Sequence, residues 1–346
     1  MRLKSILFVC WLLMGLILSV SCGNDKNEPS PDPVDPETNE FVKGADVSWV
    51  TEMEENGYKF YSSTGAQTDL FALLKSYGIG AIRLRVWVNP ENGWNNIDDV
   101  LAKAKRANSC GMKIMIDFHY SDSWADPSQQ VPPKAWTSYN ISQMCDAVKN
   151  HTSEMMQKLK ASNITPTWVQ VGNETRGGML YPLGAIDNGS NYALLTNAGY
   201  DAVKAVFGDC KVIVHIDSGQ DLDLFTYVFD YMKMNGAEYD IIGMSLYPDT
   251  SNWQQMANQC VSNINTLYAR YGKPVMICEV GMSWDQASIT KSFLLSLISK
   301  SKVETNNKCL GIFYWEPESE PSRNGGYTKG CFSNGKPTIA LDAFKE

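Results

Sequence analysis

Short apolar runs and helix-spaced segments alternate along most of this 346-residue chain. Eight runs recur, each followed by a polar stretch, and several are continuously apolar, as strands buried on both faces of a parallel sheet should be. The predicted strands are residues 42–48, 81–88, 113–120, 166–173, 211–217, 241–247, 274–280 and 310–316.

The segments between these strands carry apolar residues at helical spacing. They include Asp69–Tyr77, Ile97–Ser109, Ser142–Ala161, Tyr192–Phe207 and Trp253–Tyr271. Alternation of strand and helix predicts βαβ units and a parallel sheet. A doubly wound open sheet is the competing arrangement, but it usually has fewer strands, and no glycine-rich phosphate loop follows the first strand. We therefore predict an α/β fold, a closed (β/α)8 TIM barrel that forms a single domain over residues 41–346.

The first 21 residues have the pattern of an export signal. Arg2 and Lys4 precede an apolar run that ends in small residues before Cys22. An uncleaved membrane anchor is the alternative, but the run is shorter than the roughly 20 residues that span a bilayer comfortably. The stretch 18–22 resembles a lipobox, whose cysteine is lipidated, so we expect residues 1–21 to be a lipoprotein signal peptide. A cleaved soluble protein with an incidental cysteine is the other interpretation.

Residues 22–40 are expected to consist of the lipidated Cys22 and an acidic tether. Positions 23–40 hold four prolines, six acids and one lysine, and so little apolar surface cannot offset the entropy of an ordered chain. We therefore expect a flexible tether. The protein would be an exported lipoprotein of the cell envelope, at the outer-membrane surface of a bacterium, that touches the membrane only through its N-terminal lipid.

The charge of the predicted domain is acidic. The formal charge of −8 becomes −10 without Arg2 and Lys4, and −5 without the tether's six acids and one lysine. An acidic domain repels phosphate backbones, so we expect no nucleic-acid partner.

Seven cysteines remain beyond Cys10 and Cys22, and none shows the short paired spacing of a zinc site. Most fall in apolar patterns, so we expect buried thiols, with one disulfide left open whose partners the sequence does not name. They are Cys110, Cys145, Cys210, Cys260, Cys278, Cys309 and Cys331.

Polar and aromatic residues gather where the predicted strands end, which is the functional rim of such a barrel. The candidates there are Asp46, Arg85, Trp87, His119, Asp122, Trp124, Asn173, Glu174, Tyr247, Glu279 and Trp315.

Glu174 and Glu279 end two strands that would face each other across the barrel mouth. Retaining glycosidases need one carboxylic acid that protonates the leaving oxygen and a second carboxylate, roughly 5 to 5.5 Å away, that attacks the anomeric carbon. An ordinary ion pair is the alternative for either residue alone. Because Glu279 directly follows an apolar strand, we expect Arg85 or His119 to compensate its charge.

Several longer motifs resemble glycoside hydrolase family 53, the endo-β-1,4-galactanases, from about Phe41 to the C-terminus. The motifs are Lys43–Ser48, Arg83–Pro90, His119–Pro127, Gly172–Glu174 and Phe313–Pro317. The resemblance implies retaining, endo-acting hydrolysis of β-1,4-galactosidic bonds in galactan or type I arabinogalactan, the side chains of pectin, with galactan or galactooligosaccharides as the partner.

The same resemblance implies roles for individual residues. Glu174 would be the proton donor and Glu279 the nucleophile. Residues expected to line the subsite at the cut are Asp46, Arg85, His119, Asn173, Tyr247 and Trp315. Asp122 is expected to bind substrate beside them, and Trp87, Trp124 and Trp315 offer flat faces to sugar rings.

Only residues 280–286 separate Glu279 from the next helical pattern, whereas some relatives carry a long calcium-holding insertion there. We therefore expect no calcium site. The hydrolysis itself requires no cofactor, and we expect no other metal and a monomeric protein. His151 is expected to be a surface or packing residue. His215 either faces the cleft or is a satisfied structural histidine.

Two other functions fit the same pattern. The barrel and both acids would also serve an endo-hydrolase of mannan or β-glucan, because related enzymes share these acids and differ in their subsites. A surface lipoprotein that binds glycans without cleaving them is the alternative from another class, although the intact pair of acids argues against it.

Overall fold

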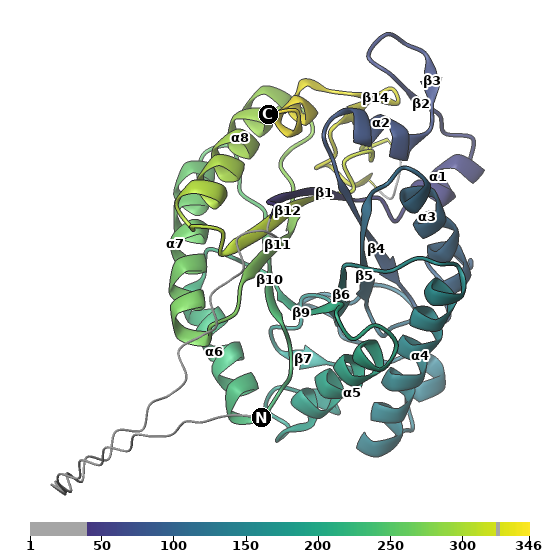
Figure 1. Cartoon of the computed structure of the whole chain (residues 1–346), viewed down its shortest axis with the longest axis vertical. Helices are drawn as coiled ribbons and strands as arrows, with labels where there is room; N and C mark the ends of the chain where they lie inside the picture. Colours follow the sequence, from purple (N-terminus) through teal and green to yellow (C-terminus); the bar gives the residue numbers. More distant parts are fainter. Residues whose placement is uncertain (1–39, 323–325) are drawn as a thin grey trace, which may run out of the picture. The chain divides into compact units, whose positions relative to one another are not determined.

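Eight parallel strands close into a barrel in the computed structural model, which describes residues 40–322 and 326–346. Figure 1 looks along the barrel, with the strands in a ring and the helices outside them. The barrel strands are β1 (Val42–Asp46), β4 (Ala81–Val86), β5 (Lys113–Phe118), β6 (Trp168–Val171), β9 (Lys211–Ile216), β10 (Ile241–Leu246), β11 (Val275–Val280) and β12 (Cys309–Trp315). Each lies inside a predicted run, apart from Cys309, which precedes its run by one residue, and the ends differ by at most two residues. Because β1 pairs with both β4 and β12, the predicted TIM barrel is confirmed.

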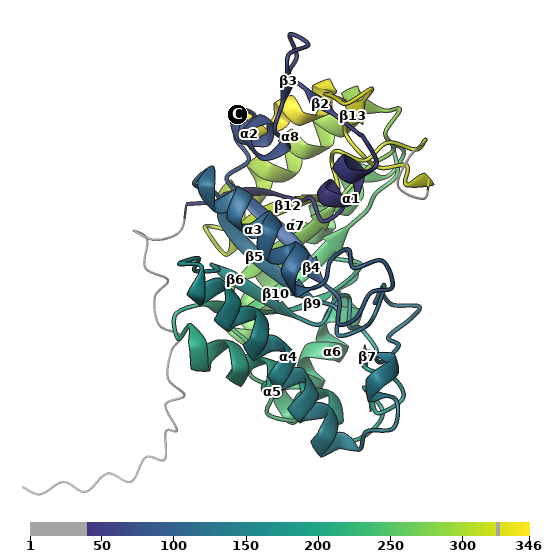
Figure 2. The same cartoon turned by 90° about the vertical axis from the view of Figure 1, so that its right-hand side faces the viewer.

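Helices cover the outside of the barrel, as Figures 1 and 2 show. They are α1 (Val50–Glu55), α2 (Leu70–Ser76), α3 (Ile97–Ser109), α4 (Ile141–Ala161), α5 (Asn191–Val206), α6 (Leu222–Met234), α7 (Trp253–Tyr271) and α8 (Ala287–Val303), with short 3-10 turns η1 (Lys134–Trp136) and η3 (Ile339–Phe344). The five helices predicted from periodicity are confirmed, each end lying within one residue of its expected place.

Local signals explain where individual helices begin and end. Asn140 caps α4 by accepting a hydrogen bond from the backbone N–H of Gln143, whose side chain bonds back to the cap. Gly272 ends α7 with φ of 66°, a left-handed conformation that a residue without a β-carbon adopts at little cost.

Three two-stranded hairpins decorate the barrel: β2 (Phe60–Tyr61) with β3 (Gln67–Thr68), β7 (Gly178–Met179) with β8 (Gly184–Ala185), and β13 (Phe332–Ser333) with β14 (Lys336–Pro337). Among the described residues, no helix is both long and apolar enough to cross a membrane. The predicted signal peptide, Cys22 and the tether up to residue 39 lie outside the described residues.

The barrel interior has an apolar lower layer and a polar upper layer. Side chains alternate along a strand with a period of two, so Ile82, Leu84 and Val86 of β4 pack outward in the large core beneath the helices. The inward lower layer is made of Val42, Ala81, Met115, Trp168, Ile213, Ile241, Met276, Cys278 and Phe313. One step further along β4 and β5, at Arg83 and Asp117, the buried inward residues become charged.

A register shift in β11 changes this alternation. Met244 of β10 pairs with Ile277, but the next residue, Ser245, pairs with Glu279, which leaves Cys278 as an extra residue in β11. A bulge of this kind re-aims the side chains that follow it. Cys278 belongs to the inner layer, and the bulge lets Glu279 also contact inward groups, where unbroken alternation would turn it toward the helices.

All seven cysteines between residues 110 and 331 are free thiols, so the disulfide left open by the sequence does not form. Five are buried, and Cys110 and Cys145 are half-buried.

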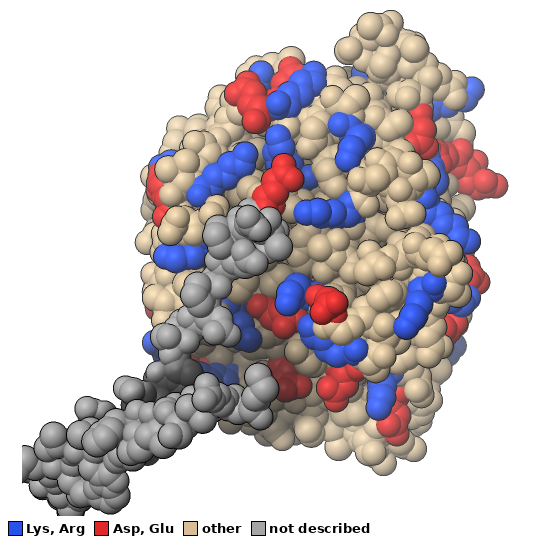
Figure 3. Space-filling model, viewed as in Figure 1, with Lys and Arg blue, Asp and Glu red and all other residues tan. Residues whose placement is uncertain are grey.

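His151 is buried against the rings of Phe118, Tyr120 and Trp136, so it is a packing residue. On the face drawn in Figure 3, basic and acidic side chains are intermixed, with uncharged areas between them.

A methyl group added at Gly44 tests the packing of the inner layer. Its β-carbon would lie 2.3 Å from the Phe313 ring, whereas a β-carbon at Gly80 meets nothing within 4 Å. We expect Gly44→Ala to lower the free energy of unfolding by about 1–3 kcal/mol and Gly80→Ala to change it by less than about 0.5 kcal/mol. Urea denaturation of both variants measures this, and equal effects would contradict the packing of Gly44 against Phe313.

Candidate active site

A cavity of about 380 Å³ opens where the barrel strands end. Seven of the eleven predicted site residues line it: His119, Trp124, Asn173, Glu174, Tyr247, Glu279 and Trp315. Ala125, Asp126, Asp217, Ser218, Gln220 and Met256 complete the wall. The closed sheet therefore brings Glu174 and Glu279 together although 105 residues separate them in the chain (279 − 174).

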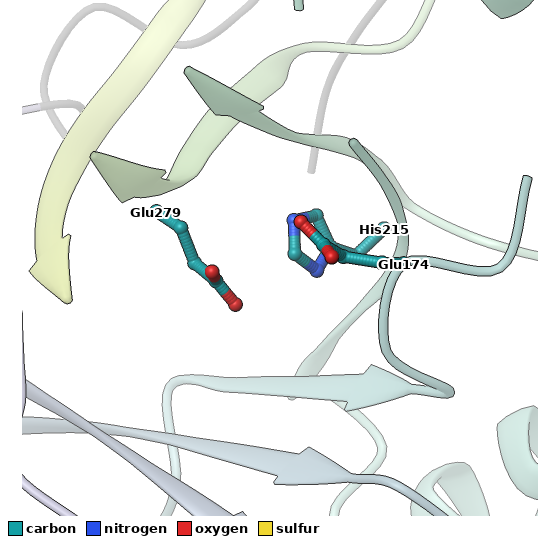
Figure 4. Close-up of side chains that lie close together, drawn as sticks. All are labelled: Glu174, His215 and Glu279. Atoms are coloured by element: carbon teal, nitrogen blue, oxygen red, sulfur yellow. The ribbon is translucent and has the colours of Figure 1, made fainter. Parts of the chain in front are cut away.

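The two carboxylates face the same space. One oxygen of Glu174, one of Glu279 and a ring nitrogen of His215 lie within 4.8 Å of one another. Figure 4 shows Glu279 reaching from the end of its strand toward Glu174 and His215. Glu174 follows β6 and has a left-handed backbone with φ of 46°, a costly conformation for a residue with a side chain, of the kind that collects at functional sites.

Glu279 is held in a setting that favours its ionised form. Its Oε1 lies 2.9 Å from Nη2 of Arg83, and its Oε2 accepts a 2.7 Å hydrogen bond from the hydroxyl of Tyr247. Burial raises the pKa of Glu279 to about 7, while Arg83 and Tyr247 act in the opposite direction. The expectation that Arg85 or His119 compensates this charge is wrong, because Arg83 is the side chain that reaches it.

Arg83 is the centre of a buried ion cluster. It contacts Asp46 at 2.8 Å, Asp117 at 2.9 Å and Glu279 at 2.9 Å, and at least 93% of each of these side chains is hidden from solvent. The three anions hold the pKa of Arg83 well above its usual value despite burial, so the guanidinium stays charged. Asp46, which the sequence placed at the cut, is fully buried, is engaged by Arg83 and by the Ser48 hydroxyl, and is not among the residues that line the cavity.

Glu174 has the opposite setting. Its Oε1 accepts a 2.6 Å hydrogen bond from the Ser245 hydroxyl, and no ion pair with a basic group is found for it in the part of the chain that the structure describes. Burial and the negative charge of Glu279 raise the pKa of Glu174 to about 8. Glu279 has Arg83 and Tyr247 as partners for its charged form, whereas burial and the charge of Glu279 favour a proton on Glu174, and this difference in partners distinguishes an acid from a nucleophile.

His215 lies behind Glu174 and does not line the cavity. Its Nδ1 is 2.9 Å from Nε2 of Gln170, and its Nε2 is 2.8 Å from Oγ of Ser245. Burial lowers the pKa of His215 well below its usual value, so the ring is neutral. Nδ1 also lies 3.0 Å from Oδ1 of Asn173, so both ring nitrogens have hydrogen-bond partners, and the Ser245 hydroxyl links the ring to Glu174. Of the two roles considered, His215 is the satisfied structural histidine.

His119 and Asn173 are both tied to the loop after β5 through Ala125. Nδ1 of His119 accepts from Nε1 of Trp87 at 3.3 Å and from the backbone N–H of Ala125 at 3.1 Å. Its Nε2 therefore carries the proton that is donated to Asp117. Nδ2 of Asn173 donates to the Ala125 carbonyl, which leaves its second N–H for a ligand in the cavity.

A second cavity of about 710 Å³ adjoins the first and shares Trp124 with it. Trp49, Trp87, Trp94 and Tyr327 give it aromatic walls. Asp122 also lines this cavity, not the first one, and its two oxygens accept the backbone N–H groups of Asn89 and Lys134.

Arg85, which the sequence also placed at the cut, lies beneath the walls of the two cavities. It is 1% exposed and lines neither cavity, because Nη1 bonds the buried Glu316 at the end of β12. Residues that strand-end reasoning missed include Arg83, Gln170 and Ser245. They lie within strands rather than at strand ends. The only sequence signal for them is that they are polar residues at positions where the two-residue strand period points the side chain into the barrel.

Glu174, His215 and Glu279 are the one group of His, Cys, Asp or Glu side chains in residues 40–322 and 326–346 with atoms close enough to share a metal ion. Both nitrogens of His215 are already hydrogen-bonded, and Arg83 brings a positive charge against Glu279. The arrangement thus favours proton transfer between side chains and substrate over coordination of a cation.

A parallel barrel that presents a protonated and an ionised carboxyl group over one aromatic-walled cavity has the architecture of a glycoside hydrolase. The sequence model of Glycosyl hydrolase family 53 matches residues 42–340, and the chain belongs to this family.

Individual relatives agree with that placement. The chain is 32% identical over 317 residues to a probable arabinogalactan endo-beta-1,4-galactanase A of Aspergillus terreus, covering 84% of this chain and 89% of the relative. It is 30% identical over 307 residues to an endo-beta-1,4-galactanase of Bacillus subtilis, covering 80% and 70%. A solved catalytic domain of family 53 from Ignisphaera aggregans superposes with a TM-score of 0.81 at 30% identity, covering 91% of this chain and 98% of that one.

The pH profile of hydrolysis tests the two carboxyl environments. Activity should fall as pH rises through the Glu174 pKa of about 8 and as it falls through the Glu279 pKa of about 7. The Ser245 hydrogen bond lowers the Glu174 pKa, so Ser245→Ala should move the alkaline limb of kcat/KM to higher pH and leave the acidic limb in place.

Tyr247→Phe is the matched variant on the other acid. The Tyr247 hydrogen bond lowers the pKa of Glu279, so its loss should move the acidic limb to higher pH. If each variant moved the limb assigned to the other, the assignment of acid and nucleophile would be reversed.

Proposed function

We propose that this protein is a retaining endo-β-1,4-galactanase that cuts galactan, or type I arabinogalactan in pectin, within the chain. The observation that carries the proposal is the pair of carboxyl groups with oxygens within 4.8 Å of each other and with opposite partners. Inverting enzymes separate their two carboxyl groups by roughly 6.5 to 9.5 Å to leave room for a water, and retaining enzymes by only about 5 to 5.5 Å. The short spacing therefore favours retention.

In the first step, the ionised Glu279 attacks the anomeric carbon while Glu174 gives its proton to the glycosidic oxygen. The carbon–oxygen bond breaks, the leaving sugar departs with the proton, and a covalent glycosyl–Glu279 ester remains. Oε1 of Glu174 is occupied by the Ser245 hydroxyl, so Oε2 is the oxygen that holds the acid proton toward the substrate.

In the second step, Glu174 is an anion and removes a proton from a water that attacks the same carbon. The ester breaks, Glu279 leaves as a carboxylate, and the anomeric configuration is retained. Arg83 and the Tyr247 hydroxyl stabilise that carboxylate in both steps, because they contact the two oxygens of Glu279.

The free N–H of Asn173 supports the charge that develops on the sugar. It lies beside the acid, where a hydrogen bond to the sugar 2-hydroxyl strengthens in the oxocarbenium-like transition state. The two cavities that meet at Trp124 supply room for sugar units beyond the one being attacked. This supports cleavage within a chain.

The names of the Aspergillus and Bacillus relatives favour galactan over mannan or β-glucan as the polysaccharide. The buried, asymmetrically partnered acids argue against a protein that binds glycans without cleaving them.

Replacing either acid tests the chemistry. Glu174→Gln and Glu279→Gln should each lower reducing-sugar release from linear galactan by at least about 100-fold, because they remove the acid or the nucleophile. Glu304→Gln, an exposed residue after α8, is the control and should keep wild-type activity. Near-normal turnover by either site variant would refute the roles. Faster release from mannan or β-glucan than from galactan would refute the substrate.

We further propose that the protein is a monomeric exported lipoprotein, held at the outer-membrane surface by a lipid on Cys22. The lipobox-like stretch before Cys22 and the acidic, proline-rich segment after it support this placement.

Metabolic labelling with a radioactive fatty acid tests the anchor. Cys22→Ser should lose the label and leave the membrane fraction, whereas Cys110→Ser, in the barrel, should keep both. Proteolysis of intact cells should remove the wild-type protein. Label retained by Cys22→Ser would refute the anchor, and protection from protease would refute the surface location.

A further inference from the structure

The proposed chemistry gives no role to Arg85, yet this buried cation has an unusual set of neighbours. Its guanidinium carbon lies 4.5 Å from the ring centre of Trp124, 5.1 Å from that of Trp49 and 5.2 Å from that of Trp87. Most cation–π contacts involve one ring within about 6 Å. Arg85 meets that distance with three rings at once.

The hydrogen bonding of Arg85 leaves its charge directed at those rings. Nη1 bonds Glu316, while Nε and Nη2 have no hydrogen-bond partner among the described residues. Removed from water, a cation over an aromatic face is worth more than it is at an exposed site. Two of the three nitrogens therefore depend on the tryptophan rings for their stabilisation.

Glu316 fixes the guanidinium and one of the tryptophan loops together. Its second oxygen accepts the backbone N–H of Trp49 at 3.2 Å. Neighbouring Glu318 is fully buried, and burial together with the charge of Glu316 raises the pKa of Glu318 well above its usual value. Glu318 is therefore neutral, and Arg85 and Glu316 form a one-to-one ion pair.

The three tryptophans come from three different loops and line both cavities. Trp49 follows β1, Trp87 follows β4 and Trp124 lies after β5. Trp87 and Trp49 belong to the larger cavity, and Trp124 is the wall shared with the catalytic one. Trp315 extends this set of rings, through an edge-to-face contact with Trp49 at a centroid distance of 5.1 Å and a tilted contact with Trp124 at 6.0 Å.

We propose that Arg85 is a positioning residue that locks Trp49, Trp87 and Trp124 into one rigid sugar-binding platform spanning the two cavities. This rests on the proposed function, because the platform's ligand is the galactan chain. Preorganised rings bind a sugar without having to be ordered by it, so loss of Arg85 weakens the binding of long chains. The bond-breaking groups are spared, since Glu279 and Glu174 are partnered by Arg83 and Ser245.

The experiment compares Arg85→Met, Arg85→Lys and the wild type on galactan and on galactooligosaccharides of increasing length. We expect Arg85→Met to raise KM for long chains by about 10-fold, the loss of roughly one cation–π contact, with kcat changed less than about 3-fold. Arg85→Lys should fall between the two, because lysine keeps the charge but not the planar stacking surface. KM for the shortest cleaved oligosaccharide should change least.

Arg106→Met is the matched control. It also removes an arginine that has an ion pair and an aromatic contact, to Glu54 and Phe71, but it lies on the outside of the barrel. It should lower stability without raising KM. If Arg85→Met lowered only stability, as this control does, or if Arg85→Lys behaved like Arg85→Met, the proposed positioning role would be overturned.

A double-mutant cycle keeps the proposal testable if Arg85→Met does not fold. Arg85→Lys and Trp87→Phe should raise KM non-additively, by a factor that differs from the product of the single effects by at least about 3-fold, because the two side chains act through one contact. Additive effects would overturn the proposal. A wild type that releases no sugar from galactan would instead refute the proposed function, and near-UV circular dichroism of Arg85→Lys would still report whether the tryptophan platform had been disturbed.

Discussion

The placement of one guanidinium, that of Arg83, determines the rest of the site. It is the cation that reaches Asp46, Asp117 and Glu279, and the four side chains are almost entirely hidden from solvent. Breaking such a cluster leaves buried charges without partners, which is far more costly than losing a surface ion pair. Because three anions share one cation, the cluster keeps a negative balance. A further carboxyl group beside it cannot also ionise easily, and Glu174 is that group. The acid and the nucleophile thus acquire different protonation states from one electrostatic arrangement.

The barrel tolerates this buried ion cluster because its interior is separated into an apolar layer and a polar layer. Below, Ala81, Met115 and Trp168 are part of an apolar layer that excludes water from the inside of the sheet. Above, the same inward faces of the same strands carry Arg83, Asp117 and Gln170. The buried polar network beneath the cavity is therefore built on strands, which hold side chains more rigidly than loops do. The bulge in β11 completes the set, because it brings Glu279 into the polar layer directly after an inward-facing Cys278.

Sequence patterns predicted the barrel, five of its helices and the seven cavity residues near strand ends. Strand and helix periodicities are local signals, and the placement of active sites where barrel strands end follows from the topology alone. They were not sufficient to pair charges. Arg83 and Arg85 lie two residues apart on one strand and share its inward face, so no local signal tells which of them meets Glu279. Glu316, the partner of Arg85, is 231 residues away. Asp46 ends its strand as a ligand-binding residue would, but it pairs in register with Arg83 on the neighbouring strand β4, whose guanidinium engages it inside the barrel.

Arg83 and Arg85 of β4 both point into the barrel interior, but they have different partners and different roles. Arg83 lies among carboxylates that balance its positive charge, and this ion cluster controls the protonation of the reacting carboxyl groups. Arg85, one pleat nearer the rim, has a single anion and three aromatic faces. A charged group so placed cannot shift without losing both its ion pair and its ring contacts, so it ties three separate loops to the barrel wall. Trp124 belongs to the walls of both cavities. The rigidity of the binding surface therefore depends on Arg85, and the charge state of the reacting carboxyl groups depends on Arg83, the preceding inward-facing residue of the same strand.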